Sequence, residues 1–236
     1  MKFMSGLVLM ACLFFGSLTY SQNTKSSVIV TGAMKNVMWN GQLKGAIQLD
    51  TIANKKHLYG LGPIEGLRGE IMIIDGKCYT SYVKSSTEMK VVEDYQVKAP
   101  FFVHGYADDW KEIKLPDNVV NLKDLENYLG EVTKSTNKPF VFKLTGVADE
   151  ASIHVVNLPE GAVVKNPDDA HKGQVSYKLD DEQVIVVGFY SRNHQSVFTH
   201  HDTYMHLHLI TKDKAKMGHV DELKFKKGAV QLYLPK

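Results

Sequence analysis

The sequence predicts an α+β fold, with a mixed sheet and helices in the front half and an antiparallel, strand-rich, barrel-like rear half. Apolar residues recur at helical spacing in the front half. Short strand-like runs separated by polar turns fill the chain from Pro139 onward. Of the 236 residues, 44% are hydrophobic and 10% are aromatic, which is enough for a full core. This composition excludes disorder, collagen and coiled coil.

The N-terminus has the pattern of a secretory signal peptide over residues 1–21. Lys2 supplies a positive charge, residues 5–18 are almost wholly apolar, and small residues stand at Thr19 and Ser21. The apolar run is shorter than the roughly 20 residues that a spanning helix needs. We therefore predict cleavage after Ser21, export to the periplasm or the medium, and no stable membrane insertion of the mature chain. An uncleaved anchor is the alternative.

Removal of residues 1–21 leaves a mature chain, residues 22–236, with Cys78 as its single cysteine. This chain cannot form an internal disulfide. An exported protein of this kind is held together by its core, by subunit contacts such as those of a homodimer, or by a bound metal. Cys78 lies in an alternating run, and we interpret it as a small buried side chain rather than a nucleophile.

The first mature segment predicts an amphipathic helix packed on a sheet, because Val30, Met34, Val37 and Met38 have helical spacing. The glycine-rich run at residues 60–63 is expected to end this unit.

A hairpin follows, in which Asp75-Gly76 joins strands over residues 70–74 and 77–83. Residues 71–74 are apolar on both faces. This strand is therefore expected at the buried centre of a sheet.

Asn121 precedes an apolar stripe and predicts a capped helix over residues 122–134. A soft boundary near residues 134–139 separates the two halves of the chain. The strands predicted beyond it cover residues 140–145, 151–157, 174–179, 183–190, 204–210, 218–225 and 229–234.

The charge balance is nearly neutral, with 28 Lys and Arg against 26 Asp and Glu, which argues against a nucleic-acid partner. The unusual count is that of histidine, at ten residues. Six of these lie in the last fifth of the chain, namely His194, His200, His201, His206, His208 and His219.

His206 and His208 are two residues apart on a predicted strand, so both imidazoles lie on one face. His219 follows after a polar stretch of the right length for a hairpin, which would bring a third imidazole beside them. Three nitrogen ligands with open positions are typical of a catalytic zinc in this rear half. Copper, nickel and iron(II) accept the same ligands. The alternative is a polar face of an exposed sheet.

The remaining histidines give weaker signals. His194, His200 and His201 lie in a polar segment and are interpreted as loop or lid residues that are structural or face solvent. The other four show no partner pattern and carry no prediction: His57, His104, His154 and His171.

Residues 204–210 and 217–221 resemble the zinc-binding hairpin of the acetolactate decarboxylases, whose pattern is aromatic-x-His-Leu-His-Phe, a charged turn and Gly-Gly-His-Val-Leu-Asp. Residues 60–70 and 73–79 resemble that family's Gly-Leu-Gly-Thr-Phe-Asn-x-Leu-Asp-Gly-Glu and Leu-Asp-Gly-x-Phe-Tyr motifs. Weaker landmarks fit at residues 99–102 and 186–189. The resemblance covers nearly all of the mature chain.

The resemblance implies a zinc lyase that decarboxylates 2-acetolactate, a small 2-hydroxy-3-oxo acid, to acetoin. In this interpretation His206, His208 and His219 hold the metal, which stabilises the enediolate formed as carbon dioxide leaves. Glu70 matches the family's motif glutamate, and is implied to be the acid that protonates the enediolate or an outer ligand that orients the metal. Without the resemblance, Glu70 would be interpreted as a strand-end carboxylate in solvent.

Two features of the family pattern are missing. The family's Ser-His-Val-x-x-Arg-x-x-Pro segment corresponds to residues 151–159, where Val156 stands in place of the arginine that meets the substrate's charged end. The family's C-terminal tail, which supplies another glutamate to the site, has no counterpart before Lys236.

These departures leave two other functions open. One is an exported metal-binding or sensing protein without decarboxylase activity. The other is a lyase or isomerase for another small chelating substrate, with Arg192 or Lys143 in place of the missing arginine.

Overall fold

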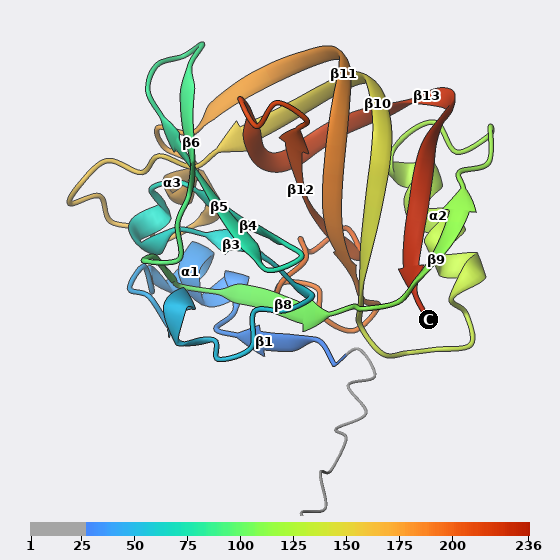
Figure 1. Ribbon diagram of the computed structural model, residues 1–236. Helices are drawn as coiled ribbons and strands as arrows, with labels where there is room; N and C mark the ends of the chain where they lie inside the picture. Colours follow the sequence, from blue (N-terminus) through green and yellow to red (C-terminus); the bar gives the residue numbers. More distant parts are fainter. Residues whose placement is uncertain (1–26) are drawn as a thin grey trace, which may run out of the picture.

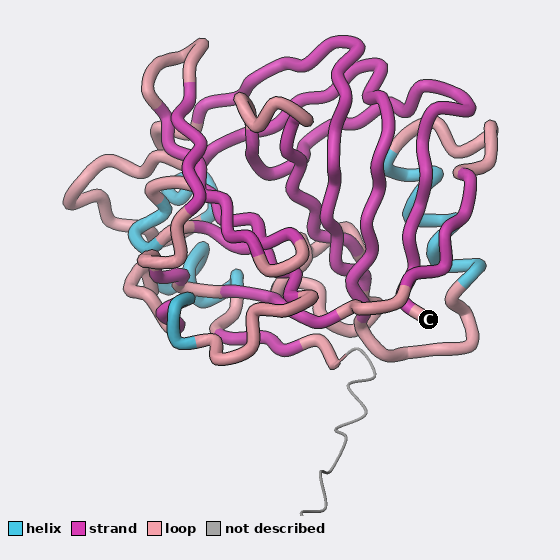
Figure 2. The backbone as a smooth tube through the Cα atoms, in the orientation of Figure 1, coloured by secondary structure: helices cyan, strands magenta, loops and turns pink. Residues whose placement is uncertain are grey.

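The computed structural model describes residues 27–236. Strands dominate this part of the chain and helical turns are few (Figure 2). The predicted signal peptide, residues 1–21, lies outside the described residues. None of the described helices is long and apolar enough to cross a membrane.

The front half forms a six-stranded sheet with the order β1-β8-β3-β4-β5-β6, drawn on the left of Figure 1. Neighbouring strands in it are antiparallel. A separate two-stranded pair, β2 and β7, accompanies it. The elements are β1 (Ile29–Thr31), α1 (Met34–Asn40), β2 (Ile47–Gln48), η1 (Leu49–Thr51), β3 (Leu58–Pro63), η2 (Glu65–Leu67), β4 (Glu70–Ile74), β5 (Lys77–Val83), β6 (Met89–Glu93), β7 (Lys98–Ala99) and β8 (Phe102–Tyr106).

The rear half forms an antiparallel sheet with the order β10-β11-β12-β13-β9, and helix α2 lies at the right of Figure 1 beside it. β13 also pairs with β10. The four strands β10, β11, β12 and β13 are therefore paired in a closed ring. The elements are β9 (Trp110–Lys114), α2 (Leu122–Val132), β10 (Phe140–Val155), α3 (Pro167–Ala170), β11 (Val175–Tyr190), β12 (Met205–Thr211) and β13 (Met217–Pro235).

The predicted hairpin is confirmed as β4 and β5. Asp75 and Gly76 have φ angles of 45° and 80°, the left-handed pair that a tight hairpin turn needs. A Cβ on Gly76 would also lie 2.2 Å from the carbonyl oxygen of Lys55, which excludes larger residues. β4 lies between β3 and β5 and is almost entirely buried, as predicted.

The predicted capped helix is confirmed as α2. The Asn121 side chain accepts a hydrogen bond of 3.0 Å from the Asp124 N–H. Leu125 and Leu129 are fully buried against the rear sheet, whereas the helix ends at Val132, two residues before the predicted end. The predicted boundary at residues 134–139 falls between α2 and β10.

The front half differs from the prediction in two respects. Helix α1 begins only at Met34, and Val30 lies in strand β1. Residues 60–63 are part of the buried strand β3 rather than a break. Glycine is needed there for close packing, because a Cβ on Gly60 would lie 2.5 Å from the ring of Phe102. The predicted mixed sheet is therefore an antiparallel sheet with short helices.

The rear strands are longer than predicted because two expected turns are irregularities inside continuous strands. Asp181 has a φ of 51° and Gly228 a φ of 71°, yet both lie within strands, β11 and β13 respectively. The register of β13 against β10 shifts around Gly228, as in a bulge that bends a strand without ending it, whereas the register of β11 against β10 does not change at Asp181. The expected strands over residues 140–145 and 151–157 are likewise merged into β10.

A shared core joins the two halves. Tyr59, Leu61 and Met72 of the front sheet belong to the same buried cluster as Val187 and Ile210 of the rear sheet. Cys78 lies in a separate core of the front half, and burial raises the pKa of its thiol to about 12. The prediction that Cys78 is a buried side chain rather than a nucleophile is consistent with this setting.

Candidate metal centre

Three histidines converge where β12 meets β13. His206 and His208 lie on one face of β12, and His208 is directly opposite His219 of β13. Each ring offers one nitrogen as a ligand, and these three nitrogens all lie within 4.8 Å of one another. The alternating residues Met205, Leu207 and Leu209 are buried in the rear core, which holds this face of β12 in position. The structure therefore brings together the three histidines that the sequence predicted.

The spacing of two of the three candidate ligands fits a tetrahedral metal ion. The Nε2 atoms of His206 and His208 are 3.2 Å apart. A zinc–nitrogen distance of about 2.05 Å and a tetrahedral angle require ligand nitrogens about 3.3 Å apart. His206 is 3% and His208 0% exposed, so the alternative of a polar face on an exposed sheet is wrong.

Burial keeps these imidazoles neutral. It lowers the pKa of His206 to about 3, with further lowering from His200 and His154. Burial and the neighbouring histidines also hold the pKa values of His208 and His219 well below their usual range. A neutral imidazole offers the lone pair that a metal ligand must supply.

Glu70 lies beside this group at the start of β4. One carboxylate oxygen, Oε2, is 3.6 Å from His208 Nε2, and the other accepts a hydrogen bond of 3.2 Å from the Val156 N–H. The side chain is nearly inaccessible, so it is not a strand-end carboxylate in solvent. Burial raises the pKa of Glu70 well above its usual range, and Asp221 adds to this, while the Val156 hydrogen bond opposes it. Burial therefore favours the protonated form of this carboxyl.

The residues predicted from the sequence share their cavity with three further histidines. His154, His171 and His200 line it together with Glu70, His206 and His219. The ring of His154 is 4.7 Å from that of His219, and the ring of His200 is 5.4 Å from it, between centroids. None of the described residues that line the cavity is a lysine or an arginine; the other lining residues are Met34, Met38, Pro63, Leu67, Phe101 and Val156.

Residues 29–234 of this chain match the sequence pattern of the alpha-acetolactate decarboxylase family. The chain belongs to this family. Alpha-acetolactate decarboxylase of Brevibacillus brevis is 27% identical over 213 residues, which cover 86% of this chain and 72% of that protein. The enzyme of the same name from Methanosarcina mazei is 26% identical over 174 residues, which cover 74% of this chain and 58% of that protein.

Solved structures show the same fold. Alpha-acetolactate decarboxylase from Bacillus subtilis strain 168 matches with a TM-score of 0.71 and 20% identity, over 89% of this chain and 86% of that one. A protein of unknown function from Staphylococcus aureus, similar to alpha-acetolactate decarboxylase, matches with a TM-score of 0.69, 17% identity and the same coverage. The predicted family resemblance is thus confirmed.

Neither residue considered as a replacement for the acetolactate decarboxylase arginine lines the cavity. Arg192 donates to the carbonyl oxygen of Gly130 at 2.5 Å and to the Tyr190 hydroxyl at 3.3 Å. Lys143 Nζ lies 4.3 Å from the ring centroid of Tyr233. Both cations are engaged elsewhere, and Val156 lines the cavity, as expected for the position of the missing arginine.

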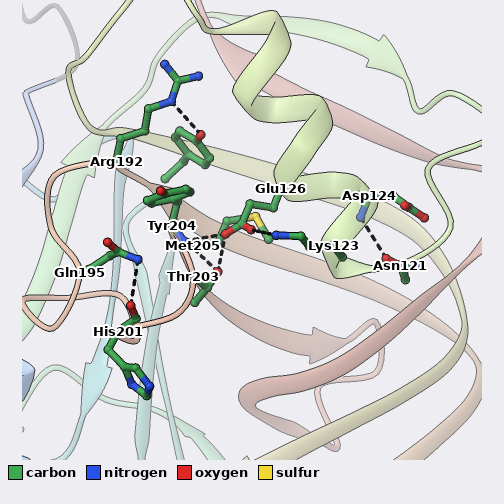
Figure 3. A network of polar contacts seen from close by, with 11 residues as sticks. Asn121, Lys123, Asp124, Glu126, Arg192, Gln195, His201, Thr203, Tyr204 and Met205 are labelled. Atoms are coloured by element: carbon green, nitrogen blue, oxygen red, sulfur yellow. Dashed lines mark hydrogen bonds and ion pairs between the residues drawn. The ribbon is translucent and has the colours of Figure 1, made fainter.

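The three histidines between β11 and β12 differ in position. His200 lies in a loop, as predicted, and is partly buried in the lining of the cavity rather than facing solvent. A hydrogen bond of 2.7 Å joins His194 Nδ1 and Ser191 Oγ, and the His194 ring stacks on that of Phe198. His201 is exposed and its backbone carbonyl accepts from Gln195, as Figure 3 shows.

Glu126 of α2 fixes the end of this segment where β12 begins (Figure 3). Its carboxylate accepts hydrogen bonds of 2.7 Å from the Thr203 hydroxyl and 2.6 Å from the Tyr204 N–H, and it pairs with Lys123 at 3.0 Å. The pKa of this carboxyl is lowered because these hydrogen bonds outweigh the effect of burial. Local sequence patterns do not predict this contact, because it joins residues that are 77 and 78 positions apart.

Replacing Glu126 with alanine should lower the free energy of unfolding by about 1–2 kcal/mol, because two partly buried hydrogen bonds lose their charged acceptor. Chemical denaturation of purified protein would measure this. Glu131→Ala, on the same helix but exposed, is the matched control and should change stability by less than about 0.5 kcal/mol. Equal effects of the two substitutions would contradict the prediction.

Acid should destabilise the metal-free protein through the three converging imidazoles. The pKa of His206 is about 3 in the fold against an ordinary value of 6.5, so between these pH values the unfolded chain binds more protons than the folded chain. The free energy of unfolding therefore rises with pH in this window and falls as pH drops, by up to about 1.4 kcal/mol per pH unit for His206 alone.

Urea unfolding of metal-free protein at pH 7 and pH 5 would measure this loss. A His206→Asn variant removes one of the titrating groups and should show a shallower pH dependence. Identical slopes for the two proteins would refute the assignment to His206.

Proposed function

We propose that this protein is a metal-dependent carboxy-lyase that converts 2-acetolactate to acetoin and carbon dioxide. The observation that carries the proposal is the placement of three neutral, converging imidazoles beside a buried carboxylic acid. The names of the matching relatives supply the substrate. His206, His208 and His219 would hold the metal, with zinc as the ion that best suits three imidazoles in tetrahedral geometry.

A bound divalent ion supplies Lewis-acid stabilisation of negative charge on the substrate's oxygen atoms. The protein's own acid is Glu70. As the bond between the carboxylate and C2 breaks, its electron pair passes into the enediolate, and C2 then needs one proton. Glu70 has a raised pKa and lies 3.6 Å from His208 Nε2, so it is the buried acid that can donate this proton before it is reprotonated from solvent.

Incubation of zinc-loaded protein with 2-acetolactate, under conditions where spontaneous decarboxylation is slow, tests the proposal. Acetoin formation well above the rate without protein is expected. The absence of acetoin above that background rate would refute the assigned activity.

The lack of lysine and arginine among the described cavity residues supports a second candidate function, a metal-binding protein that has lost decarboxylase activity. Tight zinc binding without turnover of acetolactate or related 2-hydroxy-3-oxo acids would favour this candidate. Turnover would exclude it.

We also propose that the protein is exported, on the basis of the charged and apolar pattern of residues 1–21. Mass spectrometry of the protein recovered from the periplasm or medium would show a chain beginning at Gln22. Recovery of the full-length chain from the cytoplasm would refute the export proposal.

A further inference from the structure

His154 is the one cavity histidine that is held by a carboxylate. Its Nδ1 atom is 2.6 Å from Asp221 Oδ1, the shortest contact of any histidine in the described part of the chain. β10 and β13 create this contact, because His154 is directly opposite His219 and Asp221 follows two residues later. The approach of the two strands requires Gly218, where a Cβ would lie 2.4 Å from the His154 carbonyl oxygen.

This contact orients the ring of His154. Asp221 Oδ1 accepts and His154 Nδ1 donates in it, so Nδ1 carries the hydrogen. The Nε2 atom of the same ring is then an acceptor with a free lone pair. Asp221 is 35% exposed and lines a neighbouring cavity of about 370 Å³.

His154 is next to the metal ligands without being one of the three converging groups. Its ring lies 4.7 Å from the ring of His219, between centroids, and it lines the same cavity as Glu70. An oxygen atom bound at the three-histidine centre would therefore be a neighbour of the His154 ring. With Val156 apolar, the remaining polar side chains of the cavity are Glu70 and the imidazoles.

We propose that His154, oriented by Asp221, is a further substrate-contacting residue whose Nε2 accepts a hydrogen bond from the hydroxyl group of a 2-hydroxy acid bound at the metal. The inference rests on the proposed function and adds a residue that selects for the substrate's hydroxyl. An acid with hydrogen or methyl in place of that hydroxyl leaves the Nε2 acceptor unpaired, and the site discriminates against it.

Two unreactive acids of equal size test this role. 2-Hydroxy-2-methylpropanoate carries the hydroxyl, and 2,2-dimethylpropanoate carries a methyl group in its place. Calorimetric titration of the zinc-loaded full chain should show tighter binding of the hydroxy acid. Asp221→Asn and His154→Phe should each weaken binding of the hydroxy acid about tenfold, the loss of one hydrogen bond, and change binding of 2,2-dimethylpropanoate by less than about twofold.

Asp202→Asn is the matched control, because Asp202 is an exposed carboxylate that lines the same neighbouring cavity as Asp221. It should leave both affinities unchanged. The zinc content of each variant, measured by metal analysis, should equal that of the wild type.

Equal binding of the two acids by the wild type, a retained hydroxyl preference in either variant, or loss of zinc from either variant would overturn the inference. Loss of zinc would instead assign His154 to the metal centre. If the wild type prefers the hydroxy acid through His154 yet makes no acetoin from 2-acetolactate, the decarboxylase proposal fails and this inference stands.

Discussion

Replacing His206 with alanine should abolish tight zinc binding and reduce acetoin formation to the background rate. The substitution leaves His208 and His219 as the only two imidazoles of the converging group. Changes to residues that merely support metal ligands cost about 10- to 100-fold in affinity, and loss of a ligand should cost more than about 100-fold. Zinc competition titration and an acetoin assay on the same preparation would measure both effects.

The matched control is His104→Ala, which removes a buried histidine from β8 that does not line the cavity. It should retain zinc and activity, apart from a loss of stability. A His206→Ala variant with full activity would show that the ligand set is wrong. Parallel losses in the two variants would indicate that the effect is general unfolding.

Replacing Glu70 with glutamine should lower turnover by about 100-fold or more while zinc content stays at the wild-type value, because the amide cannot donate the required proton. The raised pKa of Glu70 also predicts the pH profile of the wild type. Activity depends on the protonated acid, so it should fall on the alkaline side as Glu70 loses its proton. The residual activity of Glu70→Gln should lack this alkaline decline.

A rate measurement across pH, with metal analysis of each sample, tests this role. Glu93→Gln, an exposed carboxylate on β6, is the control and should behave as the wild type. Loss of zinc from Glu70→Gln would instead assign Glu70 to orienting the metal. Full activity in the variant would exclude both roles.

Features that depend on neighbouring residues could be predicted from the sequence. The Asp75-Gly76 turn and the Asn121 cap are formed by local dihedral angles and local hydrogen bonds, so their residue types are sufficient signals. The pairing of His206 and His208 on one face of β12 follows from strand geometry in the same way.

Features that depend on pairing between distant strands were missed. The contact of His154 with His219 and Asp221 comes from the register of β10 against β13, which local patterns do not encode. The one sequence signal for His154 is its place in residues 151–159, which resemble the family's Ser-His-Val segment. Aspartate at position 181 predicts a turn, because this residue type favours turns. In the structure β11 pairs with β10 both before and after Asp181, so the residue stays within the strand.

The hydrogen bond between Glu70 and position 156 has a consequence for how this site can change over evolutionary time. The donor is the backbone N–H of Val156, so every residue type except proline can provide it. The side chain at that position can therefore be exchanged without disturbing the anchoring of the proposed acid. Under the proposed function, proton donation by Glu70 and contact of the side chain at position 156 with the substrate are separable, so a lineage can exchange residue 156 while it conserves Glu70.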